Sequence, residues 1–292
     1  MIRSLTASSI PSNVPEDSQN VLIVGGGVIG LCCGWYLSKA GYKVTILDRD
    51  PTRKSACSDE NAGMVVPSHF IPLAAPGVIS QGLKWMLNPK SPFYMRPRLD
   101  PALWSWCWKF FRHANVRHVE NSKHILSTIS LESRRLFLEL ADELNFNLKT
   151  CGLMMLCQTE AGLEEEAEVA SMAAEVGVQA EVCNAGRVRE LDPEVRMDVV
   201  GGVWFEQDCH LDPLEFMEEL RRGIREREGT FLDDEAKDFI RQGDRLGVVE
   251  TTKGERLKAD WFVLAGGAWT PEMMRQLGLR LPMQGGKGYS LT

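Results

Sequence analysis

The sequence lacks any apolar run of the roughly 18 residues needed to cross a bilayer. It also lacks an excess of positive charge, since 33 Lys and Arg stand against 40 Asp and Glu, a formal net charge of -7. A surface that binds nucleic acid needs clustered cations to displace counterions, so no nucleic-acid partner is expected. Residues 1–19 contain no apolar segment of the kind found in secretory signals, and their polar composition predicts a disordered tail.

Cysteine pairs with metal-binding or redox spacing are also missing. The chain has eight cysteines in 292 residues, and none of them forms C-x-x-C. A chain of this length buries enough apolar surface to fold without disulfides, so we expect free thiols, no metal site and a cytoplasmic location. Cys32 and Cys33 are adjacent within a predicted helix and are expected to be buried free thiols.

A βαβ unit is present near the start of the chain. Residues 21–24 form a short, wholly apolar run that predicts a buried parallel strand. Residues 28–40 read as a helix that Gly41 ends, and residues 44–47 predict a second strand ending at Asp48. Strand, helix and strand in about thirty residues are typical of a nucleotide-binding fold.

The turn between the first strand and the helix, Gly25 to Gly30, matches G-x-G-x-x-G. Its glycines suit a tight turn, a close approach to a pyrophosphate and close packing of helix on strand. Asp48 lies twenty-three residues after Gly25, where an acidic side chain binds a ribose hydroxyl. The pattern predicts a binding site for a dinucleotide. It leaves NAD and FAD both open, although Asp48 argues against a 2′-phosphate and the adjacent Arg49 weakens that argument.

The rest of the chain is less regular. Seven prolines between residues 67 and 101 predict an irregular, functional stretch from residue 51 to 101, and it favours FAD mildly over NAD because no further βα unit follows directly. Further helices are expected along the apolar stripe from Ile125 to Leu144, over 162–176 and from Asp212 to about Gly229. Strands are expected at 153–157, 239–240, 248–252 and 261–265.

These elements predict an α/β fold with a Rossmann-like nucleotide-binding domain and an inserted mixed-sheet domain. We expect the first domain to combine residues 20–80 and 185–275. The inserted domain is expected to comprise residues 81–184 and 276–292 and to bind the substrate.

Several motifs, in order along the chain, resemble those of the FAD-dependent D-amino acid oxidase superfamily, and within it the bacterial D-amino acid dehydrogenases. The motifs are VLIVGGGVIG with Asp48, Ser58-x-x-Asn61-Ala62-Gly63-Met64, Ala75-Pro76-Gly77 with Lys84-Trp85-Met86, Phe262 to Trp269, and Lys287-Gly288-Tyr289-Ser290. The resemblance implies FAD as the cofactor and hydride transfer from a D-amino acid to the flavin. The products would be a 2-oxo acid and ammonia. Glycine or sarcosine oxidation is the alternative.

The resemblance also implies roles for individual residues. Those expected to contact FAD are Val24, Gly25, Gly27, Val28, Ile29, Gly30, Asp48, Arg49, Ser58, Asn61, Ala62, Gly63, Met64, Ala236, Ala265 and Gly266. His69 and Tyr289 are the candidates for the substrate side, with a structural role as the alternative for each. Relatives carry a further glycine-rich loop and a substrate-binding Arg beyond the point that corresponds to Thr292. The chain is therefore also read as a truncated flavin-binding fragment that needs a continuation or a partner subunit.

The aromatic stretch around Trp104, Trp106 and Trp108 allows two readings. Such dehydrogenases pass electrons to a quinone, and aromatics beside Lys109 and Arg112 suit peripheral contact with the inner face of a membrane. Packing of this helix in the core of the inserted domain is the alternative that we favour. An oligomer is also compatible with the sequence.

Overall fold

The computed structural model describes residues 19–50, 57–86, 88, 91, 94–95 and 98–288. Contacts divide the chain into two compact units. One combines Met1–Asn61 with Pro213–Thr292, and the other is Ala62–Asp212. The first unit is thus assembled from both ends of the chain. Its limits fall at residues 61 and 213, whereas the boundaries expected from sequence lie at 80, 185 and 275, and residues 276–292 group with the first unit.

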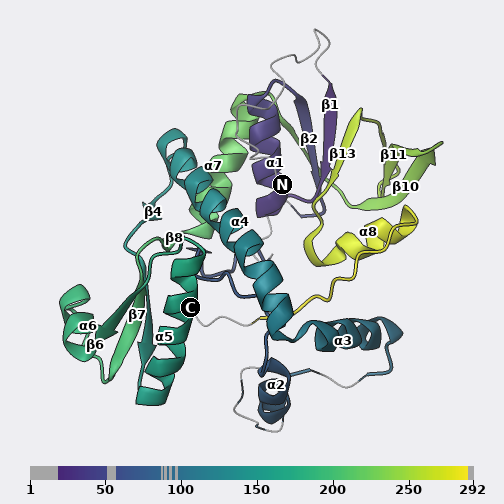
Figure 1. Cartoon of the computed structure of the whole chain (residues 1–292). Helices are drawn as coiled ribbons and strands as arrows, with labels where there is room; N and C mark the ends of the chain where they lie inside the picture. The colour runs from purple at the N-terminus through teal and green to yellow at the C-terminus, as the bar shows by residue number, and fades with distance from the viewer. Residues whose placement is uncertain are drawn as a thin grey trace. The chain divides into compact units, whose positions relative to one another are not determined.

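The first unit is built on a parallel four-stranded sheet in the order β13-β1-β2-β9 (Figure 1). The strands are β1 (Asn20–Val24), β2 (Lys43–Asp48), β9 (Thr230–Asp233) and β13 (Trp261–Leu264). The side chains of Val21 to Val24 are all buried, as expected for a central parallel strand. The predicted α/β class with a Rossmann-like sheet is confirmed.

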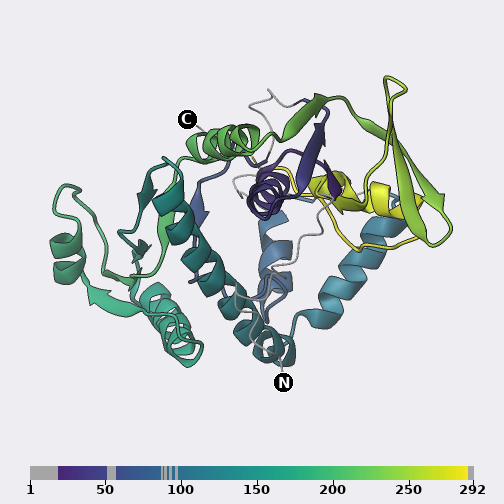
Figure 2. The ribbon, with the colours of Figure 1, turned by 90° about the horizontal axis from the view of Figure 1, so that it is seen from above.

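Two helices, α1 (Val28–Lys39) and α7 (Pro213–Glu226), pack against each other beside this sheet. Figure 2 looks along α1, drawn in purple. A Cβ placed on Gly223 of α7 would lie 2.2 Å from the ring of Trp35 on α1. The fully buried Trp35 ring therefore occupies the space that a side chain at position 223 would need, and the two helices come close at this point.

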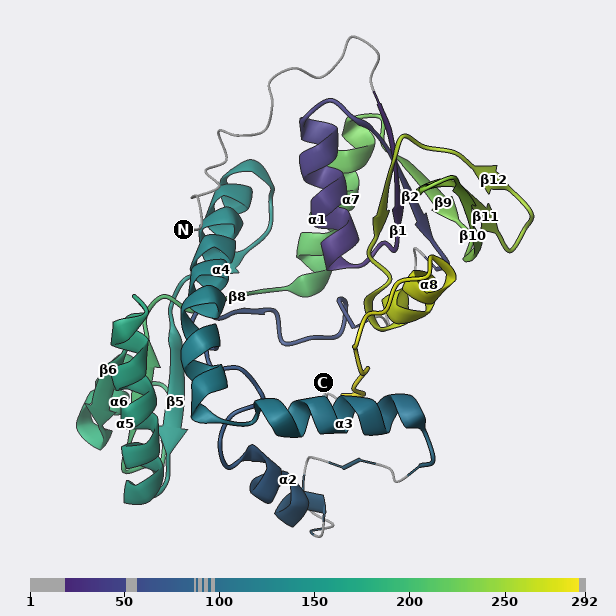
Figure 3. The same cartoon turned by 45° about the vertical axis from the view of Figure 1, so that its right-hand side comes forward.

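A three-stranded antiparallel sheet completes the first unit, formed by β10 (Ala236–Gln242), β11 (Arg245–Thr251) and β12 (Arg256–Leu257) (Figure 3). Phe239 and Val249 of this sheet share a buried cluster with apolar side chains of the parallel sheet. After β13 the chain forms a short 3-10 helix (Gly267–Trp269) and α8 (Thr270–Gln276).

The tight connection from β9 to β10 is held by Asp234. Its carboxylate accepts hydrogen bonds from the N–H of Glu235 at 2.7 Å, the hydroxyl of Thr252 at 2.5 Å and the N–H of Lys253 at 3.2 Å. Burial opposes ionisation of this carboxyl, but these donors together with Thr251 hold its pKa well below its usual range. Asp234 is therefore ionised and hydrogen-bonded in the folded protein.

This arrangement predicts a pH dependence of stability. Because the folded-state pKa of Asp234 is depressed, its contribution is complete above the unfolded pKa of about 4 and is lost as the pH falls below that value. The free energy of unfolding of Asp234→Asn should therefore be lower than that of the wild type at pH 7, and the difference should shrink towards pH 3. Urea unfolding, followed by circular dichroism at several pH values, measures this difference in the free energy of unfolding. A difference that is constant with pH would contradict the assignment.

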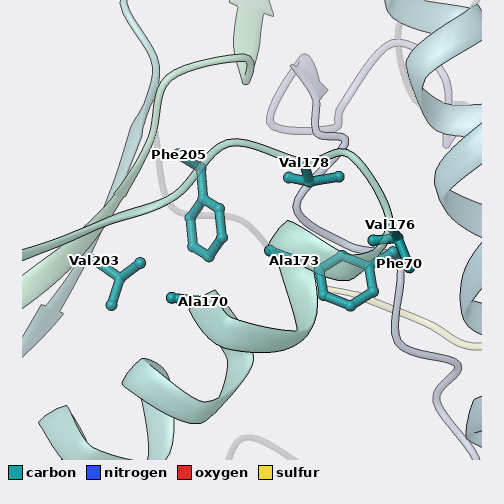
Figure 4. Close-up of a cluster of buried hydrophobic side chains, with 7 residues drawn as sticks. All are labelled: Phe70, Ala170, Ala173, Val176, Val178, Val203 and Phe205. Atoms are coloured by element: carbon teal, nitrogen blue, oxygen red, sulfur yellow. The ribbon is translucent and has the colours of Figure 1, made fainter.

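The second unit contains two three-stranded sheets, in the orders β3-β8-β4 and β5-β7-β6. Their strands are β3 (Met64–Val65), β4 (Leu148–Lys149), β5 (Leu153–Cys157), β6 (Glu181–Asn184), β7 (Gly201–Phe205) and β8 (Cys209–Leu211). The helices are α2 (Val78–Met86), α3 (Pro101–His113), α4 (Val116–Glu143), α5 (Glu160–Glu175) and α6 (Ala185–Leu191). Figure 4 shows the core of this unit, where Phe70, Ala173 and Phe205 pack with Val176 and Val178.

Two local expectations need correction. The stretch predicted as irregular contains helix α2. The apolar stripe of α4 is exposed at Ile125 and Ile129. Two polar side chains of α4 nearby, Lys123 and Ser127, are buried. The Lys123 ammonium pairs with Glu120 at 2.8 Å and with Glu175 of α5 at 2.7 Å.

The cysteines are free, as expected, but their burial varies. Cys32 and Cys33 are half-buried, and Cys57 and Cys151 are exposed. Burial, with a smaller contribution from Cys33, raises the pKa of Cys32 to about 12. The Cys32 thiol is therefore protonated at neutral pH and unsuited to nucleophilic chemistry.

Candidate functional site

The turn after β1 is shaped by Gly25. Its φ is +112°, in the region that favours glycine, and a Cβ there would lie 2.4 Å from the carbonyl oxygen of Ala265. The turn is anchored on both sides, because the N–H of Gly25 donates to the carbonyl of Leu47 at 2.9 Å and the N–H of Ala265 donates to that of Val24 at 2.8 Å. Three segments distant in sequence thus meet at the carboxyl ends of three neighbouring parallel strands.

Helix α1 begins immediately after this turn. Gly27 is its N-cap and provides no side-chain cap, so the N-terminal N–H groups of the helix are not covered by its own residues. A Cβ at Gly30 would lie 1.9 Å from the carbonyl oxygen of Gly25. The helix and the turn can approach this closely only because residue 30 is glycine. Ile29 is exposed, with 66% of its surface accessible. The arrangement is a glycine-lined helix N-terminus, a geometry suited to a phosphate.

Asp48 ends β2 beside the same turn. Its Oδ2 atom accepts a hydrogen bond from the N–H of Gly26 at 2.5 Å, and its Oδ1 atom accepts one from the N–H of Asp50 at 2.9 Å. The carboxylate is half-buried and oriented by backbone donors. It is therefore fixed next to the glycine turn.

The guanidinium of Arg49 already contacts two side chains of the first unit. Its guanidinium lies over the ring of Trp269 at 4.0 Å from the centroid and pairs with Glu235 at 3.6 Å. Sequence reasoning left Arg49 as a possible partner for a 2′-phosphate. Neither Trp269 nor Glu235 was expected to contact Arg49, because nothing in their spacing from Arg49 indicates this contact.

Ser58 lies over the start of α1. Its Oγ accepts a hydrogen bond from the N–H of Val28 at 3.0 Å, and a Cβ at Gly27 would also lie 3.0 Å from it. Asn61 stabilises this turn by donating from Nδ2 to the carbonyl of Ser58 at 2.7 Å. Ser58 thus places a hydroxyl at the helix N-terminus, and Asn61 holds the turn that carries it.

Gly266 and Ala236 are two further candidate cofactor contacts, and both lie in the first unit. A Cβ at Gly266 would lie 2.6 Å from the methyl carbon of Met273, so the close contact here is with α8. Ala236 opens β10, opposite Thr251, and packs at the edge of the buried cluster around Phe239.

The remaining candidates belong to the second unit or fall outside the described residues. Gly63 has a φ of +63°, and its carbonyl accepts from the N–H of Leu211 at 2.9 Å. Met64 pairs with His210 in the β3–β8 ladder. Ala62, on the other side of Gly63, is exposed. His69 is also exposed and contacts Ser68. Tyr289 lies outside the described residues.

These observations test the fit of a dinucleotide to the first unit. The glycines leave no room for side chains at the turn, the helix N-terminus presents N–H groups, and a carboxylate stands at the end of the neighbouring strand. A pyrophosphate and a ribose require these three elements. The residues present therefore fit the cofactor. The described part of the chain contains no group of three or more His, Cys, Asp or Glu side chains that could hold a metal ion.

Comparison with known proteins agrees with this geometry. Residues 20–292 match the family described as DAO, FAD dependent oxidoreductase. The chain is 33% identical over 279 residues to the D-amino acid dehydrogenase of Agrobacterium fabrum and 34% identical over 282 residues to that of Methylobacterium nodulans. These alignments cover 94% and 93% of this chain and 66% of each relative, so the chain spans about two thirds of their length.

Solved structures show the same fold. Glycine oxidase from Geobacillus kaustophilus has a TM-score of 0.64 at 22% identity, with 90% of this chain and 60% of that chain covered. L-α-glycerophosphate oxidase from Mycoplasma pneumoniae, solved with FAD bound, has a TM-score of 0.59 at 16% identity, with 89% and 57% covered. The family match extends over both compact units. The chain belongs to the DAO family of FAD-dependent oxidoreductases.

Proposed function

We propose that the first unit binds FAD through the turn from Val24 to Gly30. The N–H groups of Gly27 and Ile29 would face the pyrophosphate, and Val28 would reach it through the Ser58 hydroxyl that its own N–H binds. Asp48 would accept hydrogen bonds from the ribose of the adenosine. The observation that carries this proposal is the glycine cradle, in which a Cβ at Gly25 or Gly30 would lie within 2.4 Å of a backbone oxygen.

The other residues of the site follow from their places around this turn. Ser58, hydrogen-bonded to Val28, would donate its hydroxyl proton to a phosphate oxygen. Arg49 would take part only through its stack on Trp269. Ala236, Ala265 and Gly266 would line the cofactor from the first unit. Asn61 with Ala62, Gly63 and Met64 would supply backbone contacts.

We further propose that the whole protein oxidises D-amino acids to 2-oxo acids and ammonia. Two relatives named D-amino acid dehydrogenase, at 33% and 34% identity, support this substrate class. Bound FAD would accept the hydride, and the protein would bind and orient the amino acid. His69 and Tyr289 are proposed for the substrate side, and a quinone is proposed as the electron acceptor.

The visible spectrum of the purified chain tests both proposals. With added FAD, the protein should retain flavin absorbance after gel filtration. Under anaerobic conditions this absorbance should be bleached by D-amino acids and not by their L-enantiomers, glycine or sarcosine. Loss of all flavin on gel filtration would contradict the cofactor site. Bleaching by glycine or sarcosine alone would replace the D-amino acid proposal with amine oxidation.

Helix α3 supports peripheral contact with a membrane. Trp104, Trp108 and Phe111 follow one another at helical spacing, are 60–65% exposed and line an apolar surface patch. Leu103 is the buried residue of this helix, and Trp106 and Phe110 are half-buried, so only part of the aromatic set that was expected in a core faces inward. Lys109 and Arg112 are exposed beside the patch, where they can reach anionic headgroups. No helix in the described part of the chain is long and apolar enough to span a membrane.

Flotation with liposomes containing anionic lipid tests this contact. The double variant Trp104→Ser, Trp108→Ser should lose most of the floated protein, because it removes two interfacial aromatic side chains. Trp261→Ser is the matched control, since Trp261 is 59% exposed on β13 of the first unit. Equal flotation of wild type and double variant would exclude α3 as the membrane-binding surface.

A further inference from the structure

A buried carboxylate and a serine lie behind His69 in the second unit. Asp208, in the connection between β7 and β8, is fully buried. Its Oδ1 atom accepts from the N–H of Ser68 at 3.1 Å, and its Oδ2 atom accepts from the Ser68 hydroxyl at 2.6 Å. The Ser68 hydroxyl proton is thereby committed to Asp208. Its oxygen remains available only as an acceptor.

The Ser68 oxygen lies 3.1 Å from Nδ1 of His69. Because Ser68 has already donated its proton, this contact requires His69 to donate from Nδ1–H. A neutral imidazole carries one proton, so Nε2 then holds a lone pair. The His69 ring is exposed, and no hydrogen-bond partner of Nε2 is found within the part of the chain that the structure describes.

The backbone fixes this segment firmly. Phe70, the next residue, is fully buried in the cluster with Ala173, Val176 and Val178 (Figure 4). The N–H of His69 donates to the carbonyl of Val66 at 3.1 Å. Ser68 and Phe70 point inward while His69 points outward, so the imidazole is presented from a rigid support.

The surroundings of Asp208 act on its carboxyl in opposite directions. Burial raises its pKa above the usual value, and the two Ser68 hydrogen bonds and the positive charge of Arg134 only partly offset this rise. Arg134 of α4 donates from Nε to the carbonyl of Gln207 at 2.6 Å. The other titratable groups nearby are Cys209, Cys151 and His210, and burial raises the pKa of the Cys209 thiol.

We propose that Asp208 and Ser68 are positioning residues that hold His69 in the Nδ1–H tautomer, so that Nε2 accepts the proton of the substrate's α-ammonium group. This inference rests on the proposed function. Hydride loss from the α-carbon needs a neutral amine, whose lone pair forms the new bond to carbon. In the proton transfer the ammonium N–H bond breaks, its electron pair stays on the amine nitrogen, and an Nε2–H bond forms. Asp208 balances the imidazolium charge through Ser68.

Nitrogen-15 NMR of the histidine rings tests the hydrogen-bond relay independently of activity. In the whole chain, the neutral His69 ring should show the Nδ1–H pattern, assigned with His69→Gln. Ser68→Ala and Asp208→Asn should abolish that preference. Ser122→Ala is the matched control, because Ser122 contacts Nδ1 of His118 at 3.5 Å and should leave His69 unchanged. An Nε2–H pattern in the wild type, or no change in Ser68→Ala, would overturn the relay. Ser68→Ala also decides the question if Asp208→Asn fails to fold.

The pH dependence of flavin reduction tests the role of the proton acceptor. With a D-amino acid, His69→Gln should reduce flavin more slowly than the wild type near neutral pH. This deficit should disappear at high pH, where the substrate amine is already neutral. A deficit that is equal at all pH values would indicate a structural role and overturn the assignment. If D-amino acids do not reduce the wild-type flavin, the proposed function fails, and the NMR result still decides whether His69 is held as described.

Discussion

Replacing Gly30 with alanine should destabilise the first unit by about 3 kcal/mol or more, because its Cβ would overlap a backbone atom that has no room to move. The Cβ would lie 1.9 Å from the carbonyl oxygen of Gly25 and 3.4 Å from the Cγ2 atom of Ile23. Gly25 is in turn fixed by its hydrogen bond to Leu47 and by its contact with Ala265. Relief of the overlap would therefore separate α1 from β1 and disturb the parallel sheet.

Two matched substitutions show whether the effect comes from this overlap. Gly286→Ala should leave stability unchanged, because a Cβ there meets nothing within 4 Å and its φ is not positive. Gly27→Ala should fold, because its Cβ would meet only the Ser58 side chain, whose hydroxyl at 3.0 Å can rotate away. Chemical unfolding followed by circular dichroism measures all three. Wild-type stability of Gly30→Ala would show that helix and strand are less closely packed than described.

The parts of the site that sequence predicted are local ones. Val21 to Val24, the glycine turn and Asp48 lie within one βαβ unit, where a buried strand, a helix start and a second strand each have a short-range pattern. The structure places Asp48 against the N–H of Gly26, twenty-two positions away in the chain. Such spacing is fixed by the length of the crossover helix, so it can be read from sequence.

The features that sequence did not show depend on contacts between distant residues. Strand β9 pairs with β2, although the whole second unit lies between them in the sequence. The sequence of β9, TFLD, is too short to indicate a strand by itself. Ser68 and Asp208 are 140 positions apart and meet through the packing of the second unit. His69 was singled out by its place after the Asn-Ala-Gly motif, but nothing in the sequence indicated the two residues behind it.

The second large effect concerns Asp48 and is expected on cofactor affinity. Asp48→Ala removes a carboxylate that two backbone N–H groups hold beside the glycine turn. Hydrogen bonds to a charged group contribute about 2 kcal/mol, so FAD should bind about thirty-fold more weakly. Quenching of flavin fluorescence during titration with protein measures the Kd. An unchanged Kd would exclude Asp48 from the site.

Asp48→Asn separates the charge from the shape of the side chain. Asparagine keeps one oxygen acceptor for the N–H of Gly26 and loses the negative charge, so its Kd should lie between those of wild type and alanine variant. Stability provides the second comparison, because both variants disturb the same backbone contacts with Gly26 and Asp50. If affinity falls only in parallel with stability, Asp48 acts by supporting the turn. If affinity falls more in the alanine variant than stability does, the carboxylate itself binds the ribose, as the proposed site requires.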